Sequence, residues 1–373
     1  MTDIPTTMRR IRSVVTADGS VEVSLEAVPT PEPRDGQVLV RVEAAPLNPS
    51  DIAVLLAGAS VAEARRDGDT LVVPLPEGAR GLLAATRVGQ PTIVGNEGAG
   101  VVVAAGAGAE ALLGKTVGFL SGGSYADYRV VPAMMCLPVP DGTDPRDAAS
   151  CFVNPLTALG MVETMRREGH TALVHTAAAS NLGQMLTRIC LEDGVGLVNV
   201  VRRAEQGALL RELGAEHVVV SSEASYQKDL VAAVAATGAT LGFDAIGGGE
   251  TAGQLLMAME TALIEKGTPA TGYGTSVHKQ VYIYGGLDTG PIVLDRRFGF
   301  SWGVGGWLLT PFLGTLSPDD HMRLRGRVVA GLTTTFASSY SDEVSLDGLL
   351  DPATAQGYAR QATGSKFLVR PQL

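Results

Sequence analysis

Apolar and polar residues alternate along the first part of the chain, which is the pattern of strands with one buried face. The alternation is clearest in residues 11–15, 21–25 and 38–42. From residue 171 onward the pattern changes to short apolar runs that are separated by segments with helical periodicity. We therefore expect a mainly β domain over residues 1–150 and an α/β domain after it.

Strands and helices alternate regularly through the middle of the chain. Helices are expected over residues 155–167 and 205–213, and Gly214 is a suitable terminator for the second one. Apolar runs indicate buried strands at residues 172–176, 195–202, 216–220 and 279–284. This order predicts an α/β fold with a doubly wound parallel sheet over residues 151–325.

The last part of the chain departs from this regular alternation. Residues 298–318 carry no charge but are interrupted by glycine and proline, so we expect a buried or interface helix there rather than a membrane span. Residues 266–278 are rich in glycine and threonine and are expected to form a loop. Residues 326–373 are expected to form a strand at 328–336, a helix at 352–361 and a strand at 366–369.

The turn after the strand at 172–176 has the composition of an anion site. Small residues lead into a helix that opens at Ser180, Asn181, Leu182 and Gly183. Free backbone N–H groups and the positive end of a helix dipole at such a turn bind phosphate, and in a βαβ unit the ligand is usually a dinucleotide. Ala177 and Ser180 replace the first two glycines of the G-x-G-x-x-G pattern, so an ordinary strand-to-helix turn stays open as the alternative.

The residues after the strand at 195–202 bear on the choice of dinucleotide. In NAD-binding folds an acidic residue ends this strand and holds the ribose 2′-hydroxyl. Here Arg202 and Arg203 occupy that place, and guanidinium groups suit a 2′-phosphate. The expected cofactor is therefore NADP(H), and two solvated surface arginines are the alternative.

A second part of the cofactor site is expected where the strand at 279–284 ends. Tyr284, Gly285, Gly286 and Leu287 follow that strand at the carboxyl edge of the sheet, where ligands bind in open α/β folds. The two glycines let the backbone approach a flat ring closely, which suits the nicotinamide. A plain strand-to-loop turn is the alternative.

Composition narrows the possible partners and compartments. The 373-residue chain has a formal net charge of −10 and no long basic run, so we expect no nucleic-acid partner. Cys136, Cys151 and Cys190 are far apart, which argues against a disulfide framework and a cysteine-rich zinc site. The N-terminus lacks the apolar core of a signal peptide, and we expect a cytoplasmic protein with no membrane partner.

Seven short motifs occur in order along the chain and together resemble one family. They are Asn48-Pro49-Ser50-Asp51, Gly95-Asn96-Glu97-Gly98-Ala99-Gly100, Ser124-Tyr125-Ala126-Asp127-Tyr128, Asn154-Pro155-Leu156-Thr157-Ala158, the turn at 176–184, Phe243-Asp244-Ala245-Ile246-Gly247-Gly248 and Tyr284-Gly285-Gly286. This series is similar to the zinc-free medium-chain dehydrogenases/reductases, in the branch of quinone oxidoreductases and enoyl reductases. The resemblance implies a GroES-like β-barrel catalytic domain formed by residues 1–150 and 326–373, a Rossmann domain at 151–325, and a homodimer. It also implies that Thr157, Gly247 and Lys366 help to bind the cofactor.

The same resemblance bears on zinc. Zinc-binding members carry a cysteine near the N-P-x-D position and a histidine in a G-H-E motif, whereas this chain has Asn48-Pro49 and Asn96 there. The five histidines have no ligand-like spacing, and His175 is expected to be a core residue with satisfied hydrogen bonds. We therefore expect a metal-free protein.

Without a Lewis acid, hydride has to pass to an acceptor that is already activated. The leading hypothesis is an NADPH-dependent reductase of quinones or other small, electrophilic α,β-unsaturated carbonyl compounds. Asn48 is the candidate catalytic residue, and a loop-capping asparagine is the alternative.

Two other functions stay open. The first is a 2-enoyl-thioester reductase. The tyrosine that donates a proton in such enzymes is missing from the matching residues 81–85. Arg65-Arg66 or Arg296-Arg297 would supply the basic entrance that a CoA or carrier substrate needs. The second is a non-catalytic NADPH-binding protein.

Overall fold

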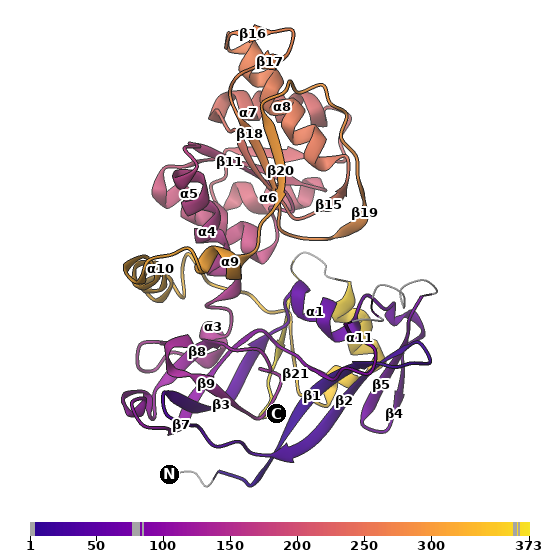
Figure 1. Cartoon of the computed structure of the whole chain (residues 1–373), viewed down its shortest axis with the longest axis vertical. Helices are drawn as coiled ribbons and strands as arrows, with labels where there is room; N and C mark the ends of the chain where they lie inside the picture. The colour runs from indigo at the N-terminus through magenta and orange to yellow at the C-terminus, as the bar shows by residue number, and fades with distance from the viewer. Residues whose placement is uncertain (1–3, 77–82, 84–85, 361–363, 365) are drawn as a thin grey trace. The chain divides into compact units, whose positions relative to one another are not determined.

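The computed structural model of the chain describes residues 4–76, 83, 86–360, 364 and 366–373. The chain divides into two compact units, shown in Figure 1. Unit 1 comprises Met1–Val153 and Arg325–Leu373, and unit 2 comprises Asn154–Leu324. The two units are described separately below.

Unit 2 is built on a six-stranded sheet in which every neighbouring pair of strands is parallel. Its strands are β11 (Ala172–His175), β12 (Gly196–Val201), β13 (His217–Val220), β14 (Leu241–Asp244), β18 (Lys279–Ile283) and β20 (Trp302–Gly306). The spatial order is β13-β12-β11-β14-β18-β20. This is the 3-2-1-4-5-6 order of the Rossmann fold, so the direction of winding reverses between β11 and β14.

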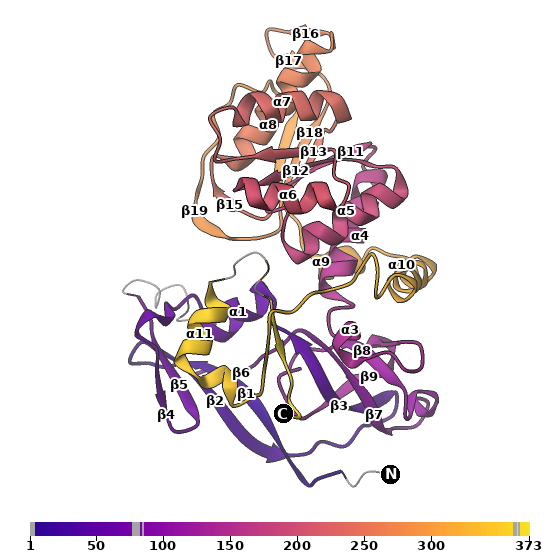
Figure 2. The same cartoon turned by 180° about the vertical axis from the view of Figure 1, so that it is seen from behind.

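Helices connect these strands and cover the sheet. They are α4 (Val153–Arg167), α5 (Asn181–Asp193), α6 (Ala204–Glu212), α7 (Tyr226–Thr237) and α8 (Thr251–Glu265). Helices α7 and α8 lie side by side, and Figure 2 shows α5 next to α6. The core under α7 and α8 is aliphatic, with Val174, Val198, Leu230 and Leu255 among its buried members. Two small two-stranded sheets complete the unit. Strands β15 (Gly247–Gly249) and β19 (Asp288–Ile292) pair in parallel, and β16 (Ala270–Thr271) and β17 (Gly274–Thr275) pair antiparallel.

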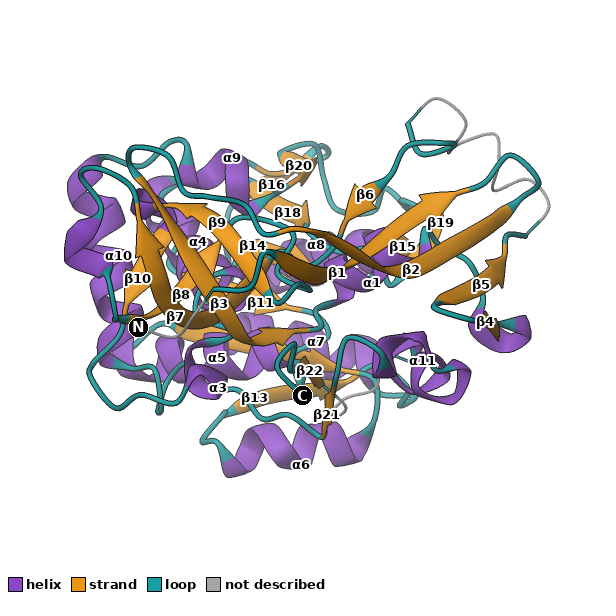
Figure 3. Ribbon diagram, turned by 90° about the horizontal axis from the view of Figure 1, so that it is seen from below, coloured by secondary structure: helices purple, strands orange, loops and turns teal. Residues whose placement is uncertain are grey.

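Unit 1 contains two β-sheets, and Figure 3 shows their long strands. The first sheet has the order β4-β5-β2-β1-β6, formed by Arg65–Asp67, Thr70–Pro74, Ser20–Pro29, Thr7–Val15 and Thr92–Ile93. The second has the order β10-β8-β7-β3-β22-β21, formed by Cys136–Pro138, Thr116–Leu120, Glu97–Ala105, Gln37–Pro46, Phe367–Val369 and Asp342–Val344, and β9 (Tyr128–Pro132) also pairs with β3. Because β22 pairs with β3, the C-terminal residues belong to the same sheet as the N-terminal strands.

Three helices of unit 1 pack beside these sheets. They are α1 (Pro49–Leu56), α3 (Pro145–Ala148) and α11 (Pro352–Ala359). Leu55 of α1, Tyr358 of α11 and Val23 of β2 belong to one buried cluster. The apolar faces of α1 and α11 therefore fill the space beside the first sheet.

Most elements predicted for unit 2 from the sequence are confirmed, but the uncharged segment 298–318 is not a helix. It forms strand β20, then the short helix α9 (Leu309–Leu313). A side chain at Gly303 would have its Cβ 2.3 Å from Oε1 of Gln280, so the glycine makes room for the neighbouring strand's side chain. The segment lacks charge because it supplies the sixth strand. Within the described residues, no helix is long and apolar enough to span a membrane.

The strand predicted at 328–336 is also wrong. Residues Pro318–Ala330 form helix α10, and residues 331–336 form turns. Leu324 and Val328 are both buried and four positions apart, which places them on one face of the helix. In the sequence, the adjacent apolar residues Val328 and Val329 resemble the start of a strand, which explains the wrong prediction.

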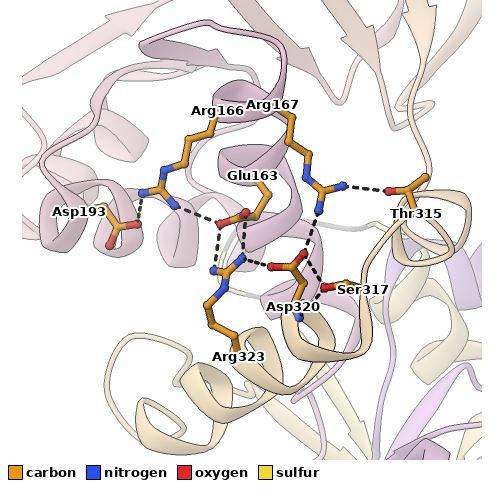
Figure 4. Close-up of polar contacts among 8 residues, drawn as sticks. All are labelled: Glu163, Arg166, Arg167, Asp193, Thr315, Ser317, Asp320 and Arg323. Carbon is orange, nitrogen blue, oxygen red and sulfur yellow. Dashed lines mark hydrogen bonds and ion pairs between the residues drawn. The ribbon is translucent and has the colours of Figure 1, made fainter.

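Ion pairs hold the first turns of α10 against α4 (Figure 4). Nη2 of Arg323 lies 3.0 Å from Oε2 of Glu163 and 2.9 Å from Oδ1 of Asp320. Glu163 also pairs with Arg166, which reaches Asp193, while Arg167 contacts Thr315 and Asp320. Charged side chains on the polar face of α10 therefore take part in ion pairs. A strand pattern has no such charged face.

A fully buried ion pair supports the sheet of unit 2 at the start of β18. Nζ of Lys279 lies 2.6 Å from Oε2 of Glu260 on α8, and the two side chains are 0% and 4% exposed. Glu260 also accepts hydrogen bonds from the backbone N–H and the hydroxyl of Thr275, both at 2.7 Å. This pair thereby ties the predicted loop 266–278, which contains β16 and β17, to the helix.

We predict that Lys279→Met lowers the free energy of unfolding of unit 2 by about 3–5 kcal/mol, because it leaves the Glu260 carboxylate buried without its cation. Fluorescence during denaturant unfolding reports this unit, since both tryptophans of the chain, Trp302 and Trp307, lie in it. Arg297→Ala is the matched control, because its pair with Asp295 is exposed. A loss below about 1 kcal/mol for Lys279→Met would contradict the prediction.

Candidate functional site

The reversal point of the unit 2 sheet is ordered by a network of buried polar groups. The Thr176 hydroxyl donates to Oδ1 of Asp244 at 2.7 Å and accepts the backbone N–H of Ala245 at 2.8 Å. Asp244 also accepts the N–H groups of Ile246 and Gly247. These bonds link the carboxyl ends of β11 and β14, which is where open α/β sheets bind ligands.

The turn between β11 and α5 presents the start of a helix at this edge. Ala177 has a φ of 50°, and the Ser180 side chain accepts the N–H of Gly183 at 3.2 Å as the helix cap. A Cβ at Gly183 would lie 2.1 Å from the Ala178 carbonyl oxygen, so only glycine allows α5 to approach the turn. Asn181 begins the helix, and Leu182 is buried. The turn thus brings a capped helix N-terminus to this edge although two motif glycines are replaced, and its binding of an anion stays a prediction.

Arg202 and Arg203 follow the end of β12 directly, and both are exposed. Oε1 of Gln206 accepts the backbone N–H of each, at 3.1 and 3.0 Å, which fixes the start of α6. Nε of Arg203 lies 4.0 Å from Oε2 of the exposed Glu205. The guanidinium groups are thus carried by a fixed backbone at the edge of the sheet.

The end of β18 places Tyr284 against His175 of β11. Nε2 of His175 and the Tyr284 hydroxyl are 2.7 Å apart, and the two rings stack at 5.7 Å. Burial lowers the pKa of His175 to about 3, so the ring is neutral. Its Nδ1 has no hydrogen-bond partner among the described residues, so the expectation of a satisfied core histidine holds for one nitrogen only.

The glycines at this edge differ in the space around them. A Cβ at Gly285 would lie 2.6 Å from the Ala245 carbonyl oxygen, and one at Gly247, whose φ is 89°, would lie 2.7 Å from that of Gly285. These two positions need glycine for packing. Gly286 faces open space and, like Leu287, is exposed. Thr157 is buried on α4.

The candidate residues of unit 1 form a second site, centred on Glu97 at the start of β7. Nδ2 of Asn48 donates to Oε1 of Glu97 at 2.8 Å, and Oε2 accepts the backbone N–H groups of Phe152 and Val153, both at 2.9 Å. Burial raises the pKa of Glu97, although these bonds and the charge of Lys366 act against the rise. Oδ1 of Asn48 has no hydrogen-bond partner among the residues that the structure describes.

Asp51 caps the helix that Asn48 precedes. Its carboxylate accepts the backbone N–H of Asn48 at 3.0 Å and that of Asn96 at 2.8 Å. Burial raises the pKa of Asp51 to about 7. The carboxylate of Asp51, and not the amide of Asn48, thus receives the N–H groups here, and the Asn48 amide is directed to Glu97.

Comparisons with known proteins agree with the fold described above. The family model of the alcohol dehydrogenase GroES-like domain matches residues 34–141. Bovine prostaglandin reductase-3 is 30% identical over 195 residues, which cover 51% of this chain and 44% of that protein. The mitochondrial enoyl-[acyl-carrier-protein] reductase of Xenopus tropicalis is 31% identical over 209 residues, which cover 53% and 52%. The matches therefore span about half the length of these curated relatives.

A solved structure from Mesorhizobium loti, described as a candidate NADPH:quinone reductase, matches the whole chain. It is 25% identical, the alignment covers 99% of this chain and 100% of that one, and the TM-score is 0.73. The chain is therefore similar to the medium-chain dehydrogenases/reductases that its motifs resemble. Its fold is the α/β combination of a Rossmann sheet and a GroES-like domain that the motifs implied.

At the two positions where the motif resemblance points to zinc ligands in zinc-binding proteins, this chain has hydrogen-bonded amides. Nδ2 of Asn96 donates to the Ser50 hydroxyl at 3.0 Å, and Asn48 is bonded to Glu97. Across the described part of the chain, no group of three or more His, Cys, Asp and Glu side chains could hold a metal ion.

The motif analysis missed the acidic members of the unit 1 site. Asp51 and Glu97 stand inside two of the motifs, and that position was the signal in the sequence that could have pointed to them. Tyr340 and Ser150, which contact each other and lie beside Lys366, carry no sequence signal. They are brought together because β22 returns to β3.

We predict that Asp51 makes unit 1 less stable as the pH rises from about 4 to 8. The carboxyl pKa is raised to about 7 in the folded protein from 3.8, so the stability it contributes is present below pH 4 and is lost as the pH rises through about 7. Each unit of pKa shift corresponds to about 1.4 kcal/mol. Asp51→Asn removes this dependence, which hydrogen exchange of the β3 and β7 amides measures. Asp141→Asn, at an exposed carboxylate, is the control, and an unchanged pH slope in Asp51→Asn would refute the prediction.

Proposed function

We propose that this protein is an NADPH-dependent reductase that transfers hydride to quinones or other small α,β-unsaturated carbonyl compounds without zinc. The observation that carries the proposal is the pair of exposed arginines, Arg202 and Arg203, at the end of the second strand of a Rossmann sheet. The names of the relatives support the class of reaction, since they are reductases of conjugated or quinoid substrates.

The residues of unit 2 fit NADPH. The turn from Ser180 to Gly183 offers backbone N–H groups for the pyrophosphate, and the arginines offer a fork for the 2′-phosphate. The open position at Gly286 leaves room for a flat ring beside Tyr284 and Leu287, and Gly247 lets the neighbouring backbone approach. When bound, the reduced nicotinamide supplies a hydride.

The residues of unit 1 fit the acceptor. Asn48 is our candidate for a polar contact with it, since its Nδ2 carries two N–H groups: Glu97 accepts one, and the other is a donor suited to the carbonyl oxygen of the acceptor. Its amide is held in place by Glu97. Quinones and enones need no Lewis acid, because the negative charge that develops on hydride transfer is delocalised onto their oxygen.

A 2-enoyl-thioester reductase is the second candidate, favoured by the enoyl reductase relative. The basic entrance suggested for such a substrate receives less support. Arg66 makes a two-point ion pair with Asp347, while Arg65 pairs with Asp67 and Arg297 with Asp295. Apart from Leu83, the residues 81–85 that lack the expected tyrosine lie outside the described residues. Turnover of crotonyl-CoA against a simple quinone separates the two candidates.

The first prediction for the cofactor concerns Arg202 and Arg203. The wild-type protein is expected to oxidise NADPH in a screen of quinones and enones. The double alanine variant is expected to bind NADPH more weakly, with a loss of binding free energy of about 1.5–3 kcal/mol for each lost phosphate contact. Affinity for NADH should barely change. An equal loss for both cofactors would refute the assignment, and NADPH binding without turnover of any acceptor would favour a non-catalytic protein.

The second prediction concerns Gly286. Because a Cβ there meets nothing within 4 Å, valine is accommodated by the protein itself and would block only a ligand. Gly286→Val is expected to abolish hydride transfer while adenosine 2′,5′-bisphosphate still binds. Gly272→Val is the control, since it also points into open space, on the hairpin between β16 and β17. Hydride transfer that survives in Gly286→Val would show that the ring lies elsewhere.

A further inference from the structure

Three side chains of unit 1 meet in a polar chain that the hydride step does not use. Nζ of Lys366 donates to the Ser150 hydroxyl at 2.7 Å, and the Tyr340 hydroxyl donates to the same oxygen at 2.9 Å. The ammonium group of Lys366 also lies 5.5 Å from the centre of the Tyr340 ring. Ser150 is 2% exposed, so this contact is sheltered from water.

The chain of hydroxyl groups leads from Lys366 toward a partly exposed segment. Tyr340 is half-buried, its hydroxyl also interacts with the side chain of Ser338, and Ser339 between them is exposed. The other end of the chain, Lys366, lies close enough to Glu97 and Asp51 for their charges to interact. Ser150 lies two residues before Phe152, whose N–H is bound by the same Glu97 that holds Asn48.

Burial, opposed by two nearby carboxyl groups, leaves the proton of Lys366 available near neutral pH. Burial lowers the pKa of Lys366 to about 8, while Glu97 and Asp51 act to raise it. Arg146 lies over the same Tyr340 ring, at 5.3 Å, and adds a second positive charge on that side. A lysine in this range is protonated at neutral pH and releases its proton readily to a basic carbon or oxygen.

We propose that Lys366 is the general acid of the reduction, and that Ser150 and Tyr340 are positioning residues that restore its proton. This inference rests on the proposed function. It supplies the proton donor that the missing tyrosine of the enoyl reductase pattern leaves unassigned.

The step balances in protons and electrons. The hydride brings two electrons to the β-carbon of an enone, and the resulting enolate takes one proton from Nζ of Lys366 at its α-carbon. The neutral amine then takes the Ser150 hydroxyl proton, Ser150 takes that of Tyr340, and Tyr340 takes one from water. One hydride and one proton are consumed for each double bond.

The variants Lys366→Arg and Lys366→Met distinguish a role of Lys366 as proton donor from a role as a positive charge. Arginine stays charged but does not release its proton in proteins, whereas methionine removes the charge with little change in volume. If Lys366 only attracts a cofactor phosphate, arginine restores function. If it donates a proton, neither variant does. Lys115→Arg and Lys115→Met are the matched controls at an exposed lysine of the same unit.

The experiment measures three quantities in the full-length protein. NMR titration of the lysine side chains in the free protein gives the pKa of Lys366. Reduction of an α-methyl enone in deuterated water gives the stereochemistry of protonation at the α-carbon. A quinone serves as the comparison acceptor, because its oxygens exchange protons with water without help. NADPH binding is measured for each variant.

We expect a pKa near 8 that shifts downward in Ser150→Ala, because the hydroxyl no longer stabilises the ammonium form. The wild-type enzyme should give one product enantiomer, with a rate that falls as the pH rises above about 8. Both variants of Lys366 should give a racemic product and lose about 100-fold or more in enone turnover, but less than tenfold with the quinone. Tyr340→Phe should slow enone turnover and keep the stereochemistry.

The proposal fails if Lys366→Arg keeps both the single enantiomer and the enone turnover, or if the measured pKa is that of an ordinary exposed lysine. If the wild-type protein oxidises NADPH with none of the acceptors tested, the proposed function is wrong, and the proposed relay is wrong with it. Turnover with unchanged stereochemistry in Lys366→Arg overturns the relay alone.

Discussion

The carboxylate of Glu97 is the interaction on which the unit 1 site depends. One side chain accepts hydrogen bonds from the amide of Asn48 and from the backbone of Phe152 and Val153, so it joins the loop before α1, the strand β7 and the segment that leads into α4. A buried carboxylate without such donors would be unstable as an anion. The requirement to satisfy Glu97 therefore fixes the position of Asn48 and of the chain around residue 152.

The sheet of unit 2 imposes the second constraint. Its order reverses between β11 and β14, and the helices on the two sides of that point leave its carboxyl edge open for a ligand. Thr176 and Asp244 use their own hydrogen bonds to hold the two strand ends together, so the edge keeps its shape without help from a ligand. Gly183, Gly247 and Gly285 then allow the backbone segments at this edge to approach one another within contact distance.

The sequence was informative where the hydrophobic period is unambiguous. Residues 172–176 and 216–220 were recognisable as strands because each contains a short apolar run, and the arginines after β12 could be located by counting strands. The period failed at Val328 and Val329, where two adjacent apolar residues on a helix resemble a strand. It also failed at 298–318, where a long uncharged segment was predicted as a helix but forms β20 and the short helix α9. Tyr340 and Ser150 could not be paired in advance, because 190 positions separate them and only the return of β22 to β3 brings their segments together.

The two units use charge in opposite ways, and this contrast indicates a division of labour. Unit 2 offers backbone N–H groups and exposed arginines, which bind an anion strongly without a cost of burial in the free protein. Unit 1 instead buries Asp51 and Glu97 close to Lys366, and burial moves the pKa of both carboxyl groups upward and that of the lysine downward. The pKa of Asp51 rises to about 7 and that of Lys366 falls to about 8, so a small change in the surroundings of these two groups moves a proton near neutral pH. A phosphate needs only a fixed positive charge, so these shifts favour the proposal that the unit 1 site exchanges protons with its substrate.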